Sequence, residues 1–237
     1  MRLIEKLMLE PAREHVISIV GSGGKTTLLY ALAREAAYTG LHTAIITTTH
    51  IMQPPSKDDL RCVYDGSTAQ IEQALADGKI IVAGTQAPNG KLMAPDTDTL
   101  HFLLQAADIL LIEADGSRRL PIKLPSSTEP VILPKTRRVI AVAGLSALGK
   151  PLGEVCHRAE LVQAQLGFTP EQTVTPKIMA ALLLQGYGTF AGLTVLLNQA
   201  DTPALAEQGE QIASLLREGG IEHILITSLL QEADSLC

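Results

Sequence analysis

Short runs of apolar residues alternate along the chain with stretches in which apolar residues recur every three or four positions. The first pattern is typical of buried strands and the second of amphipathic helices. The predicted strands are 15–20, 43–48, 79–84, 109–113, 138–143, 192–197 and 223–227. The predicted helices are 25–39, 68–76, 97–107, 157–166, 176–185 and 203–217. This alternation predicts an α/β fold, a three-layer sandwich with a mostly parallel central sheet.

Two segments interrupt the alternation of strands and helices. Residues 86–96 contain Pro88, Asn89-Gly90 and Pro95, which predict a tight turn or a small hairpin. Residues 117–137 carry four prolines, and a loop of that length in a compact domain is usually functional or disordered. Because no clear linker is present, we expect a single domain over residues 1–237, with a proline-rich loop at about 117–137 and a helical insertion at about 145–188.

The first predicted strand runs through the sequence GSGGKTT, residues 21–27, into the first predicted helix. A glycine-rich turn at such a junction points successive backbone N–H groups into one concavity, and the helix adds its positive dipole end. A polyphosphate fits this arrangement, with Lys25 on the β- and γ-phosphates and the Thr26 hydroxyl on Mg²⁺. Glycines at a strand–helix junction can be present only because they allow close packing. A lysine and two threonines directly after them favour nucleotide binding instead.

The spacing of this motif departs from the G-x4-G-K-[ST] pattern, because Ile19 stands where the distal glycine belongs. The shorter form, G-x-x-G-K-T-T, resembles the phosphate loops of the Mur ligase and folylpolyglutamate synthetase group. A dinucleotide fingerprint does not fit, since its third glycine would fall on Thr26.

The predicted strand 109–113 ends in an acid, Glu113, and a second acid, Asp115, follows. Side chains two positions apart in an extended chain lie on the same side. Carboxylates at the tip of a parallel strand beside a phosphate loop suit Mg²⁺, although such acids are also found simply solvated. The Glu-Ala-Asp stretch also resembles a Mg²⁺-binding stretch of the Mur ligases.

Three cations, Arg118, Arg119 and Lys123, follow the acidic pair. The sequence leaves open whether they neutralise a phosphate or an anionic substrate, or form a solvated surface. If the loop closes over a bound nucleotide, Arg118 or Arg119 would stabilise the charge of the transition state.

The predicted strand 192–197 runs into Asn198-Gln199-Ala200-Asp201. This stretch resembles the N-K-x-D box of GTPases, with Gln199 in place of the usual lysine. In that box the aspartate accepts hydrogen bonds from two adjacent N–H groups of guanine, and adenine would leave it unpaired. The last predicted strand ends in Thr227-Ser228, where GTPases place a small-residue loop near the guanine. Asn and Asp after a strand also form ordinary turns and caps, so GTP and ATP both remain open.

Composition and charge exclude several classes of protein. A formal net charge of −6 argues against a duplex nucleic-acid binder. Cys62, Cys156 and Cys237 lie far apart without a C-x-x-C pair, which fits a reducing cytosol and argues against a disulfide framework or a cysteine-only zinc site. No apolar run approaches the ~20 residues of a membrane span. We therefore expect a cytoplasmic protein that binds neither nucleic acid nor a membrane.

Five stretches together carry a resemblance to the YqeC family: VGSGGKTT, TTTH, IEADGSRRLPIKLPSSTEPVI, AVAGLSALGKPL followed by HR, and LLNQAD. The similarity runs from Val16 to Thr227. It implies a P-loop nucleotide-binding protein that assists maturation of a selenium-dependent molybdenum hydroxylase, with that enzyme or its maturation factors as the partner. The resemblance indicates the pathway in which the protein acts, but it does not indicate which reaction the protein catalyses.

These patterns lead us to expect a Mg²⁺-dependent hydrolase of GTP or ATP. The alternatives are a Mur-ligase-like or kinase-like transferase that passes the γ-phosphate to an acceptor, and a binding module without turnover. The sequence offers no obvious general base. The predicted catalytic residues are Lys25, Glu113, Asp115 and Arg118, and the predicted metal ligands are Thr26, Glu113 and Asp115. The predicted nucleotide-binding residues are Gly21, Ser22, Gly23, Gly24, Lys25, Thr26, Thr27, Asn198 and Asp201.

Overall fold

The computed structural model describes residues 2–52, 59–64, 67–87 and 90–230. The chain forms two compact units. The first comprises residues 1–19, 28–116 and 131–138, and the second comprises residues 20–27, 117–130 and 139–237. The chain passes between the units within strand β1 (Val16–Gly21) and within the first turn of helix α2 (Lys25–Tyr38). Compact units are not by themselves separate domains, so the single-domain organisation stays a prediction.

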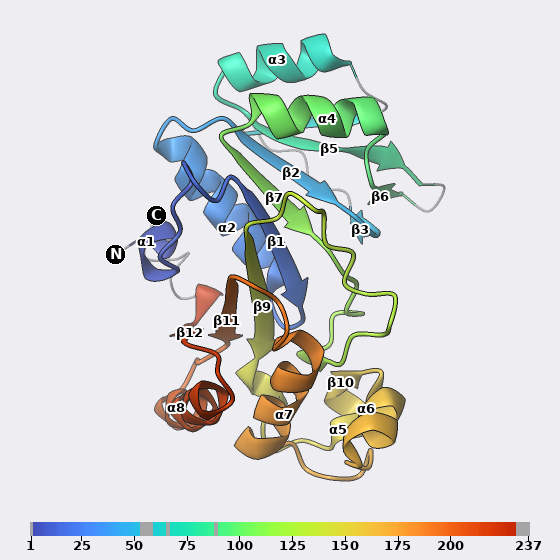
Figure 1. Cartoon of the computed structure of the whole chain (residues 1–237), viewed down its shortest axis with the longest axis vertical. Coiled ribbons are helices and arrows are strands. Elements are labelled where there is room, and N and C mark those ends of the chain that lie inside the picture. Colours follow the sequence, from blue (N-terminus) through green and yellow to red (C-terminus); the bar gives the residue numbers. More distant parts are fainter. Residues whose placement is uncertain (1, 53–58, 65–66, 88–89, 231–237) are drawn as a thin grey trace. The chain divides into compact units, whose positions relative to one another are not determined.

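The first unit is built on a parallel sheet (Figure 1). Its strands, in the order in which they pair, are β1, β7 (Ile109–Glu113), β2 (Thr43–Thr47), β5 (Ile80–Gln86) and β4 (Leu60–Tyr64). Every residue of β1, β2 and β7 is buried. Parallel strands covered on both faces are expected to be mainly apolar, and most residues of these three strands are.

A short antiparallel extension continues this sheet. Strand β6 (Lys91–Met93) returns along β5, and β3 (Ile51–Met52) pairs with β6. The predicted small hairpin is thereby confirmed, with the Ala87 N–H donating to the Lys91 carbonyl at 2.8 Å. Pro88 and Asn89 of the predicted turn lie outside the described residues.

Three further helices belong to the first unit. Helix α1 spans Leu3–Lys6. Helices α3 (Thr68–Ala76) and α4 (Thr97–Ala106) lie side by side (Figure 1). Ser67 and Asp96 cap these two helices by accepting hydrogen bonds from the backbone N–H groups of the first turn.

The second unit contains two parallel sheets. Strands β9 (Arg138–Gly144), β11 (Leu193–Asn198) and β12 (His223–Ile226) form one of them, with β11 in the middle. Strands β8 (Ile122–Lys123) and β10 (Cys156–His157) form a small sheet of their own. Strand β8 lies inside the segment predicted as a proline-rich loop.

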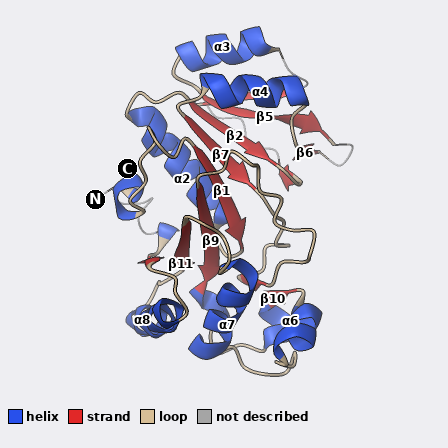
Figure 2. Cartoon of the chain, viewed as in Figure 1, coloured by secondary structure: helices blue, strands red, loops and turns tan. Residues whose placement is uncertain are grey.

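The segment 145–188, predicted as a helical insertion, contains four described helical elements besides strand β10. They are η1 (Leu145–Ala147), α5 (Leu152–Val155), α6 (Ala159–Leu166) and α7 (Pro176–Tyr187). Helix α7 packs against helix α8 (Pro203–Glu218), as Figure 2 shows. The helix expected to begin at residue 157 begins at Ala159 instead, because His157 pairs in β10 and Arg158 adopts a left-handed conformation.

The α/β fold class with a mostly parallel sheet is confirmed by these pairings. All seven predicted strands and all six predicted helices are present, with ends shifted by at most two residues. Among the described residues, no helix combines the length and apolar character that crossing a bilayer requires.

Candidate functional site

The turn between β1 and α2 requires glycine at several positions. Gly21, Gly23 and Gly24 have φ angles of +91°, +79° and +135°, which side chains rarely adopt. A Cβ atom at Gly21 would lie 2.2 Å from the Val142 carbonyl oxygen, and one at Gly23 would lie 2.4 Å from the Gly144 nitrogen. The backbone of the turn therefore follows a path that only glycine permits.

This turn is fixed by two other segments of the second unit. The Ser22 N–H donates to the Val142 carbonyl of β9 at 2.8 Å, and the Ser22 hydroxyl donates to the carbonyl of Leu120. The next carbonyl in the proline-rich segment, that of Pro121, accepts from the Gly144 N–H at 2.8 Å. The start of the proline-rich segment is thus bonded both to the turn and to the end of β9.

Lys25 lies at the first position of α2 and is 3% exposed. Its Nζ donates to the Gly21 carbonyl at 2.6 Å, so the ammonium group lies across the turn. The first N–H groups of a helix have no acceptor within that helix, and the helix dipole adds positive potential there. Thr26 and Thr27 are exposed. These features suit an anion of high charge.

Asn198, the last residue of β11, connects the turn to the end of β12. Its Nδ2 donates to the Gly23 carbonyl at 2.8 Å, and its Oδ1 accepts from the Leu229 N–H at 3.0 Å. Asn198 is 5% exposed, and a Cβ at Gly24 would lie 2.2 Å from its Nδ2. The predicted phosphate loop and the predicted N-x-x-D stretch therefore meet.

Asp201 is held by the segment that follows β12. The Ser228 hydroxyl donates to Asp201 Oδ1, and the Ala200 N–H donates to the Thr227 carbonyl at 3.1 Å. Asp201 is exposed, whereas Thr227 and Ser228 are buried. A carboxylate of fixed orientation thus faces solvent at this edge of the sheet. The contact joins the two stretches that resemble GTPase motifs.

Gln199 occupies the position at which the resembled motif has lysine. Its φ is +65°, and its Oε1 accepts from the Ser146 hydroxyl at 2.6 Å. A Cβ at Gly144 would lie 2.3 Å from that same oxygen. The Gln199 side chain is therefore hydrogen-bonded to the segment after β9. Sequence spacing gave no sign of the pairing, since Ser146 and Gln199 are 53 positions apart.

The predicted acidic residues lie at the end of β7 in the first unit. Glu113 is 8% exposed and Asp115 is completely buried. The Glu113 carbonyl accepts from the Thr47 hydroxyl at 2.9 Å and from the Thr48 N–H at 3.2 Å. Neighbouring β2 thus fixes the backbone of this strand end.

The predicted site residues are divided between the two units. The turn, Asn198, Asp201 and Arg118 belong to the second unit, whereas Glu113 and Asp115 belong to the first. Among the described residues, no three His, Cys, Asp or Glu side chains gather as a metal-binding group. The grouping of Thr26, Glu113 and Asp115 around Mg²⁺ stays a prediction.

The three cations after the acidic pair have different environments. Arg118 and Arg119 are exposed and adopt φ angles of +49° and +62°. The Lys123 side chain is 0% exposed and lies 2.9 Å from Glu129 Oε2. Of the two alternatives that the sequence left open, a solvated surface does not apply to Lys123, because its ammonium group is buried in an ion pair.

Arg158 reaches the same Glu129 oxygen at 2.7 Å. Burial by itself raises the pKa of Glu129, but hydrogen bonds and charges from Arg158 and Lys123 outweigh it and lower the pKa to about 2. Glu129 is therefore ionised at neutral pH. The sequence analysis missed this cluster, because 29 positions separate Glu129 from Arg158 and no motif spans them.

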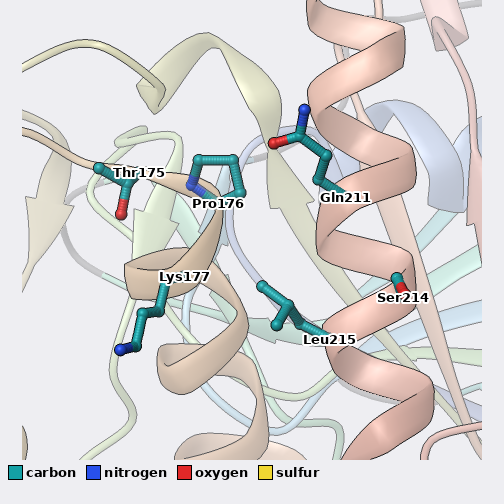
Figure 3. A pocket seen from close by; sticks show the side chains of 6 residues that line it. All are labelled: Thr175, Pro176, Lys177, Gln211, Ser214 and Leu215. Atoms are coloured by element: carbon teal, nitrogen blue, oxygen red, sulfur yellow. The ribbon is translucent and has the colours of Figure 1, made fainter.

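A hollow of about 450 Å³ lies between α7 and α8 (Figure 3). Its walls include Pro176 and Lys177 of α7 and Gln211 and Leu215 of α8. The Lys177 ammonium group points away from α8. None of the predicted site residues lines this hollow, so the turn before α2 remains the candidate site.

Comparison with known proteins identifies a matching family and a similar protein. The family described as YqeC protein matches residues 17–160. A protein of Escherichia coli (strain K12), described as "Uncharacterized protein YqeC", is 35% identical over 183 residues, which cover 75% of this chain and 71% of the relative.

A solved structure, HypB from Helicobacter pylori in complex with nickel, aligns with a TM-score of 0.43 and 11% identity. The alignment covers 98% of this chain and 89% of that one. A TM-score at this level is too low to establish a shared fold.

Proposed function

The chain belongs to the YqeC family, and we propose that it binds a nucleoside triphosphate, preferentially GTP, and hydrolyses it with Mg²⁺. One observation carries the proposal. The Asn198 side chain bonds both to the Gly23 carbonyl and to the Leu229 N–H, next to the serine that holds Asp201. The turn proposed to bind phosphate and the carboxylate proposed to read the base are thereby linked through Asn198 and residues 228 and 229.

The triphosphate is proposed to bind at the turn of residues 21–27. Gly21, Gly23 and Gly24 allow the backbone to present its N–H groups, and the N-terminus of α2 adds positive potential. Lys25 supplies the cation for the β- and γ-phosphates, and its ammonium group already lies over the turn.

Asp201 is proposed to select guanine. Guanine presents two adjacent N–H donors, and one carboxylate accepts both. Adenine presents an acceptor at the corresponding position, so the charged oxygens of Asp201 would lose their partners. Ser228 supports this role, because its hydroxyl holds one carboxylate oxygen and so restricts rotation of the group.

Thr26, Glu113 and Asp115 are the residues that we propose as Mg²⁺ ligands. Hydroxyl and carboxylate oxygens are the donors that this ion prefers. When bound, the ion neutralises charge on the phosphate oxygens, and Arg118 is proposed to stabilise the charge that develops during hydrolysis.

The biological role proposed is assistance in maturing a selenium-dependent molybdenum hydroxylase, and family resemblance is its only support. A transferase that passes the γ-phosphate to an acceptor would use the same residues. Release of inorganic phosphate in the absence of any acceptor separates hydrolysis from transfer.

The test is nucleotide binding and phosphate release by the purified full chain, with GTP and with ATP, with and without Mg²⁺. Lys25→Ala is expected to weaken nucleotide binding by about 10- to 100-fold, because a charge-assisted phosphate contact is lost. Lys177→Ala removes an exposed lysine of the same unit and serves as the control. Unchanged affinity in Lys25→Ala would contradict the proposal.

A further inference from the structure

Residues 198–201, at the end of strand β11, carry three polar side chains, and each one is fixed by a different neighbour. Asn198 bonds to the turn before α2, and Asp201 is held by the segment after β12. Between them, Oε1 of Gln199 accepts from the Ser146 hydroxyl at 2.6 Å. Asn198 and Asp201 have proposed roles toward the phosphates and the base, whereas Gln199 has none so far.

The backbone at Gln199 adopts a conformation that long side chains disfavour. Its φ angle is +65°, in the left-handed region that glycine enters freely. Other residues hold this conformation only where the surrounding structure imposes it, and such positions gather at ligand-binding segments. Because glycine would relieve the strain at this position, the presence of glutamine indicates that the side chain has a function.

The amide group of Gln199 has a fixed orientation. Its oxygen is bonded to Ser146, and a Cβ atom at Gly144 would lie 2.3 Å from that oxygen and 3.0 Å from Cδ. The oxygen is therefore turned toward the end of β9. In the described part of the chain, the two N–H groups of Nε2 have no hydrogen-bond partner, and the residue is half-buried. These N–H groups are donors that a ligand can use.

Gly144 connects this amide to the turn before α2. It lies opposite Asn198 in the pairing of β9 with β11. A Cβ atom at Gly23 would lie 2.4 Å from the Gly144 nitrogen, so the turn and the Gln199 side chain both pack against this glycine. All four residues belong to the second unit. The Gln199 amide therefore lies beside the turn that is proposed to bind the phosphates.

The order of the three side chains matches the order of the groups in a nucleoside triphosphate, in which the sugar joins the phosphates to the base. Asn198 bonds to the turn that is proposed to bind the phosphates. Asp201, three positions later, is proposed to accept from the base. Gln199 stands between them, so the sugar is the group that its amide would meet. The oxygens of sugar hydroxyls accept hydrogen bonds, which is what an amide nitrogen requires.

We propose that Gln199 recognises the sugar of the bound nucleotide. One N–H of its Nε2 donates to a ribose hydroxyl, and the Ser146 hydroxyl holds the amide in place for this bond. This role rests on the proposed function and makes Gln199 a specificity-determining residue of the same site. A ribonucleotide is preferred over a nucleotide that lacks that hydroxyl, because the amide would otherwise lose its acceptor. The preference does not depend on which base Asp201 selects.

The experiment measures the affinity of the full chain for GTP and for its 2′-deoxy and 3′-deoxy forms, with the same three forms of ATP in parallel. The wild type is expected to bind one of the deoxy forms about three- to tenfold more weakly than the ribonucleotide. Gln199→Met keeps the length of the side chain but removes its N–H groups, so this ratio should fall to about one. Gln211→Met changes an exposed glutamine of α8 and should keep the wild-type ratio.

Further variants separate the amide from the backbone. Gln199→Gly relieves the strain of the positive φ angle and is expected to fold, but it should lose the preference for the ribonucleotide. Gln199→Glu keeps an acceptor for Ser146 and removes both N–H groups, so it should lose the preference as well. Ser146→Ala should reduce the preference, and Ser146→Thr, which keeps the hydroxyl, should restore it.

Two results would overturn this role of Gln199. One is equal binding of the ribonucleotide and both deoxy forms by the wild type, and the other is a preference that Gln199→Met and Gln199→Gly retain in full. Either result leaves the proposed function standing if the wild type binds the nucleotide and Lys25→Ala weakens that binding. A wild-type protein that binds no nucleotide would refute both the proposed function and the role of Gln199.

Discussion

The Nδ2 atom of Asn198 lies 2.8 Å from the carbonyl oxygen of Gly23, although the two residues are 175 positions apart. The amide oxygen of the same side chain accepts from the Leu229 N–H. The end of β11 therefore supports the backbone of the turn before α2 and holds the segment that follows β12. This side chain therefore contributes to the shape of the proposed nucleotide site, together with the bonds of Ser22 to Val142 and Leu120.

Asn198→Ala is expected to weaken both the fold and nucleotide binding. The change leaves the Gly23 carbonyl and the Leu229 N–H without their side-chain partner, which costs about 1–3 kcal/mol of unfolding free energy per buried group. Nucleotide affinity should fall about tenfold or more, since each 1.4 kcal/mol is a factor of ten. Denaturant unfolding and nucleotide titration measure the two effects.

Asn198→Asp separates the two hydrogen bonds. It keeps an acceptor for the Leu229 N–H but places a charged oxygen against the Gly23 carbonyl. Nucleotide affinity should therefore fall at least as far as in Asn198→Ala. Wild-type affinity in Asn198→Asp would show that the bond to the turn is dispensable.

Gly24→Ala is expected to destabilise the protein by more than about 2 kcal/mol. Its φ of +135° strains any side chain, and the new methyl group would lie 2.2 Å from Asn198 Nδ2. Gly149→Ala is the matched control, because its φ is +77° and nothing lies within 4 Å of its Cβ position. That variant should lose only about 1 kcal/mol from backbone strain. Equal losses of unfolding free energy would contradict the close packing described.

Glu129 should make stability depend on acid pH. Its pKa is about 2 in the folded protein against 4.5 ordinarily, so the unfolded chain takes up its proton first as the pH falls. The contribution of ionised Glu129 to the unfolding free energy is complete above pH 4.5 and is lost as the pH falls toward 2. The difference in unfolding free energy between the wild type and Glu129→Gln should therefore decrease over that range.

The matched control for this measurement is Glu154→Gln, which changes an exposed glutamate of the same unit. Its unfolding free energy should follow that of the wild type at every pH. A constant difference between wild type and Glu129→Gln from pH 7 to pH 2 would rule out the proposed charge pairing.

Much of the fold was predictable because local signals agreed with one another. The helix predicted at 176–185 is α7, which begins with a proline, and the Thr175 side chain caps it by accepting from the Ile178 N–H. The glycines at 21, 23 and 24 predicted a turn of unusual backbone geometry, and all three have positive φ angles. Short elements such as β4, β8 and α5 were not predicted. Segments that are this short, or that mix apolar and polar residues irregularly, show little periodicity in their apolar positions.

The contacts of the site were less predictable than its residues. The motif indicated Asn198 and Asp201, but no local pattern tells which backbone carbonyl an amide will meet. The Lys123–Glu129–Arg158 cluster depends on β8 pairing with β10, and strands of two residues leave no recognisable pattern. Long-range side-chain pairing is decided by tertiary packing, which a single sequence does not display.

Cys156 is expected to resist alkylation in the folded protein. Burial is the main cause that raises the pKa of its thiol to about 12, so almost no thiolate exists at pH 8. Cys62 is only half-buried and should react before Cys156. Mass mapping after treatment with iodoacetamide should find Cys156 modified only in denaturant. Labelling of Cys156 as fast as Cys62 in the native protein would instead indicate a reactive thiol beside His157.

The central claim is that the turn before α2 and the Asn198–Asp201 stretch bind one guanine nucleotide. Its most direct test is the affinity of wild type and Asp201→Asn for GTP, ATP and xanthosine triphosphate, with Glu210→Gln, an exposed residue of α8, as the control. Asp201→Asn should bind GTP at least tenfold more weakly and xanthosine triphosphate more tightly, because the amide donates where the carboxylate accepted. An unchanged order of the three nucleotides in Asp201→Asn would contradict the claim.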